Sequence, residues 1–106
     1  MLAGASWMAE YGDPSKSEEW AYIKKYSPYH NVKAGMTYPK VLFTTSTKDD
    51  RVHPGHARKM MALLKDLGYE VLLYENTEGG HAAAANNAQR AYRRALAYSF
   101  LFKELV

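Results

Sequence analysis

Two side chains that carry out proton transfer in many enzymes each follow a short apolar segment. Asp49 comes shortly after the run at residues 41–45, and His81 comes shortly after the run at residues 70–74. A carboxylate that accepts a hydrogen bond from one imidazole nitrogen fixes the tautomer, so the other nitrogen can act as a general base at neutral pH. The pair therefore has the residue types and the chain order of a catalytic acid and base.

A nucleophile to accompany this pair is not evident in the sequence. In α/β-hydrolases the chain order is nucleophile, acid and histidine, and the serine stands in a G-x-S-x-G elbow between a strand and a helix. None of the serines stands in such an elbow; they are Ser6, Ser15, Ser17, Ser27, Ser46 and Ser99. Ser6, in the segment GAS, comes nearest, but no strand precedes it. The nucleophile must lie elsewhere or be missing.

The elements expected to position these residues are a strand, a helix, a strand and a helix. The apolar runs VLFTT and EVLLY are typical of parallel strands buried on both faces. Pro54 suits the first turn of an amphipathic crossover helix, and Gly68 suits its end. Parallel strands joined in this way bring their carboxyl ends to one edge of the sheet. We therefore expect Asp49 and His81 to lie within hydrogen-bond reach; the alternative is a helix-capping acid and an unrelated loop histidine.

Three further segments complete the expected fold. The turn GDPSKS predicts a short helix capped by Ser15 or Ser17. Residues 27–39 contain two prolines and no clear period, so they are expected to form an irregular connection packed by its tyrosines. A long helix is expected from about Asn87 to Leu105. One stripe of this helix is expected to press closely on the sheet because it is rich in small residues; it consists of Ala88, Ala91, Ala95, Tyr98 and Phe102.

The composition indicates an ordinary globular protein of 106 residues, with 47% hydrophobic and 24% charged residues. Net charge is +3, but basic residues are scattered among acidic ones, so we expect no nucleic-acid partner. No apolar run approaches the roughly 20 residues of a membrane span, and the first residues lack a signal-peptide pattern. Membrane association is not expected, and the compartment is left open with the cytoplasm favoured. Absence of cysteine excludes disulfides and thiolate chemistry.

The histidines that follow the candidate acid are of a residue type that binds metal ions. His53 and His56 stand near Asp49 and Asp50. Zinc, however, is usually held by a closed set of ligands with a locally recognisable spacing, which this segment lacks. We expect no metal and no cofactor, and we expect Asp50 to cap the helix that follows it.

Four segments together resemble the C-terminal end of prolyl oligopeptidase family catalytic domains. In chain order they are GASWMAEYGDP, KKYSPYHNV, VLFTTSTKDDRVHPGHARKM and EGGHAAA. The resemblance covers essentially the whole chain. It implies an α/β fold in which residues 1–106 form the C-terminal fragment of an α/β-hydrolase domain, with two parallel strands, a crossover helix and a C-terminal helix. The half of the domain that bears the nucleophile is absent from this chain.

The resemblance also implies roles for five residues. Asp49, the first acid of DDRV, matches the family's triad aspartate, and His81 of EGGH matches its triad histidine. Arg51 matches an arginine that binds a substrate backbone carbonyl. Trp7 resembles a tryptophan that stacks on the substrate's proline, and Tyr11 resembles a tyrosine that lines the pocket. The implied activity is hydrolysis of peptide bonds after proline, and a chain without the nucleophile is expected to lose on the order of a million-fold in rate.

A second interpretation is a non-catalytic, self-associating module derived from the same family. In the complete domain the strand at residues 41–45 would lie between the second strand and one that this chain lacks. A bared strand edge is a template for pairing with another chain. We therefore expect a homodimer with two-fold symmetry through this strand or the flanking N-terminal segment. A proline-containing peptide is the expected substrate when the domain is completed.

Overall fold

The computed structural model describes residues 3–77 and 86–106. The elements, from the N-terminus, are η1 (Ala3–Trp7), α1 (Met8–Tyr11), α2 (Ser17–Ile23), η2 (Tyr29–Asn31), β1 (Val41–Ser46), α3 (Gly55–Asp66), β2 (Val71–Asn76) and α4 (Asn87–Leu105). The predicted order of strand, helix, strand and helix is confirmed for the second part of the chain. The bounds of α4 agree with those expected, and β1 and β2 each extend beyond the expected run.

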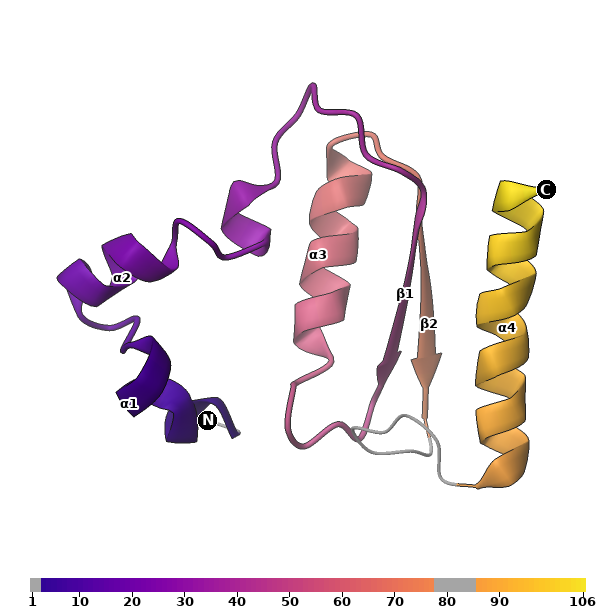
Figure 1. Ribbon diagram of the computed structural model, residues 1–106, viewed down its shortest axis with the longest axis horizontal. Helices are drawn as coiled ribbons and strands as arrows, with labels where there is room; N and C mark the ends of the chain where they lie inside the picture. Colours follow the sequence, from indigo (N-terminus) through magenta and orange to yellow (C-terminus); the bar gives the residue numbers. More distant parts are fainter. Residues whose placement is uncertain (1–2, 78–85) are drawn as a thin grey trace.

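The centre of the fold is a parallel strand pair. β1 and β2 are in register from Val41 opposite Val71 to Ser46 opposite Asn76. The ladder continues past β1, because the Thr47 N–H donates to the Asn76 carbonyl at 2.8 Å. Helices α3 and α4 lie on opposite sides of the pair, as Figure 1 shows. The parallel arrangement predicted from the two apolar runs is therefore confirmed.

Helix α3 supplies the apolar contacts to the strands. Leu64 is the buried hydrophobic residue among those described, with 6% of its surface exposed. The helix ends as the sequence predicts, since Gly68 has a φ of 90°, which a side chain would disfavour. The Gly68 N–H donates to the Lys65 carbonyl and the Tyr69 N–H to the Leu64 carbonyl, at 3.0 and 2.9 Å. These bonds satisfy carbonyls at the helix end and turn the chain into β2.

The connection before β1 is irregular, as expected, but of its own tyrosines only Tyr38 takes part in the packing around Tyr69, which comes from beyond α3 and supplies the rest. The Tyr69 hydroxyl donates to the carbonyls of Lys33 and Met36, at 3.0 and 2.6 Å. The Tyr69 ring also meets the Tyr38 ring edge to face, with centroids 4.8 Å apart. A single side chain after α3 thus fixes a segment that lies more than thirty residues earlier.

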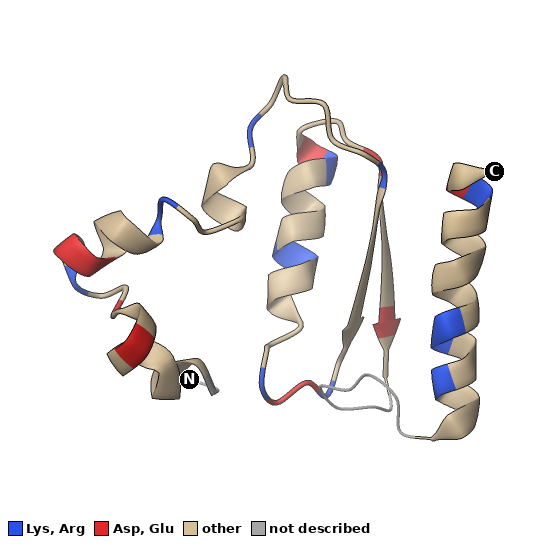
Figure 2. Ribbon diagram, viewed as in Figure 1, with Lys and Arg blue, Asp and Glu red and all other residues tan. Residues whose placement is uncertain are grey.

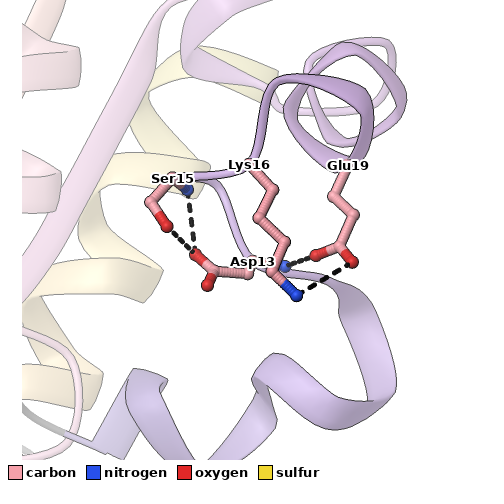
Figure 3. A network of polar contacts seen from close by, with 4 residues as sticks. All are labelled: Asp13, Ser15, Lys16 and Glu19. Carbon is pink, nitrogen blue, oxygen red and sulfur yellow. Dashed lines mark hydrogen bonds and ion pairs between the residues drawn. The ribbon is translucent and has the colours of Figure 1, made fainter.

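The predicted capping of α2 by a serine is wrong. Lys16 occupies the N-cap position without a side-chain cap, and Ser17 is already the first helical residue. The Ser15 hydroxyl instead donates to the Asp13 carboxylate at 2.7 Å, and the Asp13 N–H donates to the Glu19 carboxylate (Figure 3). The Glu19 carboxylate therefore binds the backbone of the turn before α2. The Ser15 hydroxyl is hydrogen-bonded to Asp13 and does not cap the helix.

The predicted packing of α4 is also wrong. The stripe expected to face the sheet is exposed, with Tyr98 at 67% and Phe102 at 69%. The half-buried residues of the helix are instead Gln89, Arg93, Leu96, Ala97 and Phe100. Leucine and phenylalanine cover more apolar strand surface than alanine does, so the helix turns this stripe toward the strands. The small-residue stripe is therefore exposed, and the described residues do not cover it.

Few direct contacts hold α4 to the strand pair. The rings of Tyr92 and Tyr74 lie 5.7 Å apart, and Lys40 forms an ion pair of 3.0 Å with Glu104. The Glu104 carboxylate raises the pKa of Lys40 above its usual 10.5. At the N-terminus of the helix, the Asn86 side chain accepts a hydrogen bond from the Gln89 N–H at 2.9 Å.

Charged residues are spread over the molecule. Figure 2 shows Lys and Arg on the N-terminal part, on α3 and on α4, with acidic residues on most of the same elements. Within residues 3–77 and 86–106, no helix is both long and apolar enough to cross a membrane.

Candidate active site

Asp49 stands in the loop that leaves the carboxyl end of β1. One carboxylate oxygen, Oδ1, accepts hydrogen bonds from the backbone N–H groups of Arg51 and Val52, at 3.0 and 2.9 Å. The Asp49 N–H donates to the Ser46 carbonyl at 3.2 Å. A carboxylate held by two amides of its own loop has a fixed direction, and the amides favour its charged form. The half-buried Asp49 is therefore positioned by local backbone geometry.

His81, the predicted base, lies outside the described residues, so its contact with Asp49 stays a prediction. The structure does describe the two points from which the segments bearing these residues leave the sheet. Ser46 and Asn76, the last residues of β1 and β2, are register partners and are only 1% and 3% exposed. The Asp49 loop and the segment that leads towards His81 thus start from neighbouring, buried positions.

The three predicted substrate-binding residues line one cavity of about 640 Å³. Trp7 and Tyr11 come from the N-terminal helices, and Arg51 comes from the Asp49 loop. The two aromatic rings meet edge to face, with centroids 6.3 Å apart and planes at 70°. Other residues complete the lining: Gly4, Met8, Gly12, Pro14, Ile23, Tyr26, Val52, His53 and His56. The fold therefore brings together residues that are forty positions apart in the sequence.

A smaller and more polar cavity of about 360 Å³ contains Asp49, and we call it the carboxylate notch. Its other lining residues are Thr44, Thr45, Ser46, Val52, His53, His56, Ala57 and Arg93. Val52, His53 and His56 line both the notch and the larger cavity. The large apolar cavity and the carboxylate notch are therefore neighbours, separated by the residues that precede and begin α3.

His53 holds the start of α3 in place of the expected cap. Its Nδ1 atom accepts a hydrogen bond from the Gly55 N–H at 2.9 Å, whereas Asp50 is exposed. An added Cβ at position 55 would lie 2.9 Å from the same nitrogen, so a larger residue there would displace the His53 ring. The expectation that Asp50 caps this helix is not met by the bonds that the structure shows.

Sequence analysis missed Val52, His53 and His56 as cavity residues. Their position directly after Asp49 and Arg51 could have predicted this, because residues of the same loop lie close together in space. Arg93, which lines the notch from α4, gave no such signal, because its position depends on how the helix is turned.

Neither a metal centre nor a serine elbow is found among the described residues. Within residues 3–77 and 86–106 no group of three or more His, Cys, Asp or Glu side chains could hold a metal ion. Ser46 lines the notch, but it is the last residue of β1 and is followed by a turn rather than a helix.

Two parallel strands joined by α3, with α4 on the opposite side of the pair, form part of an α/β domain. The sequence profile described as the prolyl oligopeptidase family matches residues 2–106, and the chain belongs to this family. The resemblance stated from four sequence segments is thus confirmed.

Individual relatives agree with this assignment. The chain is 58% identical over 106 residues to an uncharacterized peptidase of Sinorhizobium fredii, covering all of this chain and 15% of that protein. It is 40% identical over 107 residues to a prolyl endopeptidase of Elizabethkingia miricola, covering 97% of this chain and 15% of that protein. The chain therefore spans about 15% of the length of these relatives.

A solved structure confirms the fold class. Oligopeptidase B from Trypanosoma brucei, in a closed form with covalently bound antipain, superposes with a TM-score of 0.84 and 29% identity. The match covers 93% of this chain and 14% of that chain. The arrangement of the two parallel strands and their helices is therefore that of a fragment of the α/β-hydrolase fold.

Proposed function

We propose that this chain supplies the acid, the base and the proline pocket of a serine peptidase that cleaves after proline. The observation that carries the proposal is that Trp7, Tyr11 and Arg51 line one cavity, which adjoins the notch containing Asp49. The similarity to a prolyl endopeptidase over 97% of the chain supports the same substrate class. The serine belongs to polypeptide that this chain does not contain.

In the proposed complex, the apolar cavity receives the proline side chain. Trp7 and Tyr11 form an aromatic corner, with 56% and 58% of their surfaces still open to contact. A flat indole face suits the pyrrolidine ring, and burying both surfaces supplies apolar binding energy. The guanidinium of Arg51, which lines the same cavity, donates to a backbone carbonyl of the peptide.

The proton transfers of the proposed reaction belong to Asp49 and His81. His81 takes the serine proton as the serine oxygen bonds to the scissile carbonyl carbon, and then gives it to the leaving amine. Asp49 accepts the second imidazole N–H and stabilises the imidazolium that forms. Because two loop amides already orient the carboxylate, this hydrogen bond requires little rearrangement of the acid.

A chimeric enzyme tests the proposal. This chain replaces the matching C-terminal segment of the Elizabethkingia miricola prolyl endopeptidase. We expect turnover of a chromogenic peptide cleaved after proline, and no comparable turnover of the peptide with alanine at that position. His81→Ala should lower kcat by about ten thousand-fold or more, whereas Asp50→Ala should leave it nearly unchanged. A folded chimera whose turnover is absent, or survives His81→Ala, would contradict the proposal.

The second candidate function is self-association without catalysis, and exposed apolar surface favours it. Within the described residues β1 pairs on one side only, with β2. Helix α4 also exposes Tyr98, Phe102 and Leu105, the last at 78%. A second copy of the chain can cover a bare strand edge by antiparallel pairing across a two-fold axis.

A further inference from the structure

An ion pair between Arg58 and Glu75 connects α3 to the carboxyl end of β2. The Arg58 Nε atom donates to Glu75 Oε1 at 3.1 Å, and an Nη2 N–H donates to the same oxygen. The side chains are 46% and 24% exposed, so the contact is partly shielded from water. Two donors of one planar guanidinium on one oxygen fix the direction of approach as well as the distance.

Both partners stand beside the carboxylate notch. Arg58 follows Ala57, a residue that lines the notch, and its N–H donates to the Pro54 carbonyl at 3.1 Å. Glu75 is the register partner of Thr45, which lines the notch from β1. The ion pair therefore ties the first turns of α3, where the Asp49 loop ends, to the last residues of β2.

We propose that Arg58 and Glu75 are positioning residues that fix the Asp49 loop relative to the end of β2. This inference rests on the proposed function, in which the acid and the base leave the sheet at these two points. A partly exposed ion pair adds little to folding stability. Its effect on geometry is different, because a misplacement of about 1 Å between catalytic groups costs about a hundred-fold in rate.

The same chain offers a matched control pair. Lys40 and Glu104 form an ion pair of 3.0 Å that ties the chain just before β1 to α4. This pair connects a strand end to a helix as the first pair does, but at the amino end of the sheet. Arg58→Gln removes one ion pair beside the notch, whereas Lys40→Gln removes the pair with Glu104 and a looser pair of 3.8 Å with Glu70, both away from the notch.

The first test measures kinetics in the chimeric enzyme. We expect Arg58→Gln to lower kcat about ten- to hundred-fold. KM should rise by a smaller factor, because Arg51 moves with the Asp49 loop whereas Trp7 and Tyr11 stay in place. The double exchange Arg58→Glu with Glu75→Arg should recover most of kcat, and Lys40→Gln should change it less than two-fold. Equal effects of Arg58→Gln and Lys40→Gln, or a change confined to KM, would overturn the inference.

The second test does not need catalysis. Amide hydrogen exchange in the 106-residue chain follows the N–H groups of Arg51 and Val52, which bind Asp49, and of Thr47, which binds Asn76. We expect Arg58→Gln to accelerate exchange at these amides at least about five-fold relative to amides in the middle of α3. A uniform acceleration would show a general loss of stability and would overturn the inference.

The two tests separate this inference from the proposed function. A chimera without His81-dependent turnover refutes the proposed function, and exchange at the three amides then decides the placement of the loop. An active chimera in which Arg58→Gln behaves like Lys40→Gln refutes the inference alone.

Discussion

The two sides of the strand pair differ in how their residues are held. On the side of α3, the Asp49 loop is fixed by hydrogen bonds between residues at most three positions apart, and His53 holds the start of the next helix in the same way. On the other side, α4 is a regular helix of 19 residues tied to the strands by a ring contact and an ion pair. The Asp49 loop is therefore held mainly by its sequence neighbours, with the Arg58–Glu75 ion pair as a longer-range contact, whereas the placement of α4 depends on distant partners.

The two sides also differ in whether the described residues provide all the contacts that the side chains need. The hydrogen bonds that hold the Asp49 carboxylate come from this chain itself. A helix whose exposed stripe contains Tyr98 and Phe102 has apolar surface that the described residues leave uncovered. In relatives roughly seven times as long, further polypeptide is available to cover such a surface.

The largest contrast is expected in catalysis by the chimeric enzyme. Asp49→Asn keeps the size of the side chain but gives it an amide that can hold His81 in the wrong tautomer. We expect kcat to fall about ten thousand-fold. Arg94→Ala, on an exposed part of α4, should change kcat less than two-fold. Steady-state kinetics with a proline-containing chromogenic peptide measure both. A loss below ten-fold for Asp49→Asn would rule out the triad role.

The next contrast concerns stability. Leu64, in α3, is 6% exposed, and Leu105, in α4, is 78% exposed. Leu64→Ala should lower the free energy of unfolding by about 2 to 5 kcal/mol, because it leaves a cavity. Leu105→Ala should change it by less than about 0.5 kcal/mol. Urea denaturation of the two variants measures the difference. Equal losses would mean that the end of α4 is buried in solution.

On the side of α3 the elements were predicted correctly because their signals are local, although the expected Asp50 cap was not met. Apolar runs defined β1 and β2, Gly68 marked the end of α3, and the residues after Asp49 were close enough in sequence to be placed by one loop. The family resemblance added Trp7, whose place in the cavity no local pattern indicates.

The errors occurred where several partners compete. Ser15 was expected to cap α2, but its hydroxyl bonds to Asp13, and a capping rule does not weigh that competitor. The side of α4 that faces the strands was also misjudged. Hydrophobic periodicity shows that a helix has two different stripes, but the surface against which it packs decides which stripe is buried.

The third contrast tests self-association of the isolated chain. We expect a homodimer in which the β1 edge pairs with its copy, and we expect Thr44→Lys to raise its dissociation constant about ten-fold or more, since lysine on an edge strand blocks pairing. Thr44 is an exposed residue of β1. Phe102→Glu on α4 should have a smaller effect. Sedimentation equilibrium over a wide range of concentrations measures these constants. A strictly monomeric mass at the highest concentration would refute the dimer.

The smallest effect is expected in the turn that positions the cavity's N-terminal wall. Hydrogen bonds from the side chain and then the backbone of Ser15 lower the pKa of Asp13 below its usual 3.8 (Figure 3). Because the folded-state pKa is the lower one, the stabilisation is complete above the unfolded-state value and is lost as the pH falls through the folded-state value. Ser15→Ala should move the pKa of Asp13 back towards 3.8, and Ser99→Ala on α4 should not move it.

An NMR titration of the Asp13 carboxyl carbon measures this shift directly. The turn also contributes Gly12 and Pro14 to the lining of the large cavity. Loosening of the turn by Ser15→Ala or by acid should therefore perturb the indole resonance of Trp7 without changing the ring resonances of Tyr98. If the Tyr98 resonances moved equally, the two sides of the strand pair would be coupled, and the contrast between local and distant order would not hold.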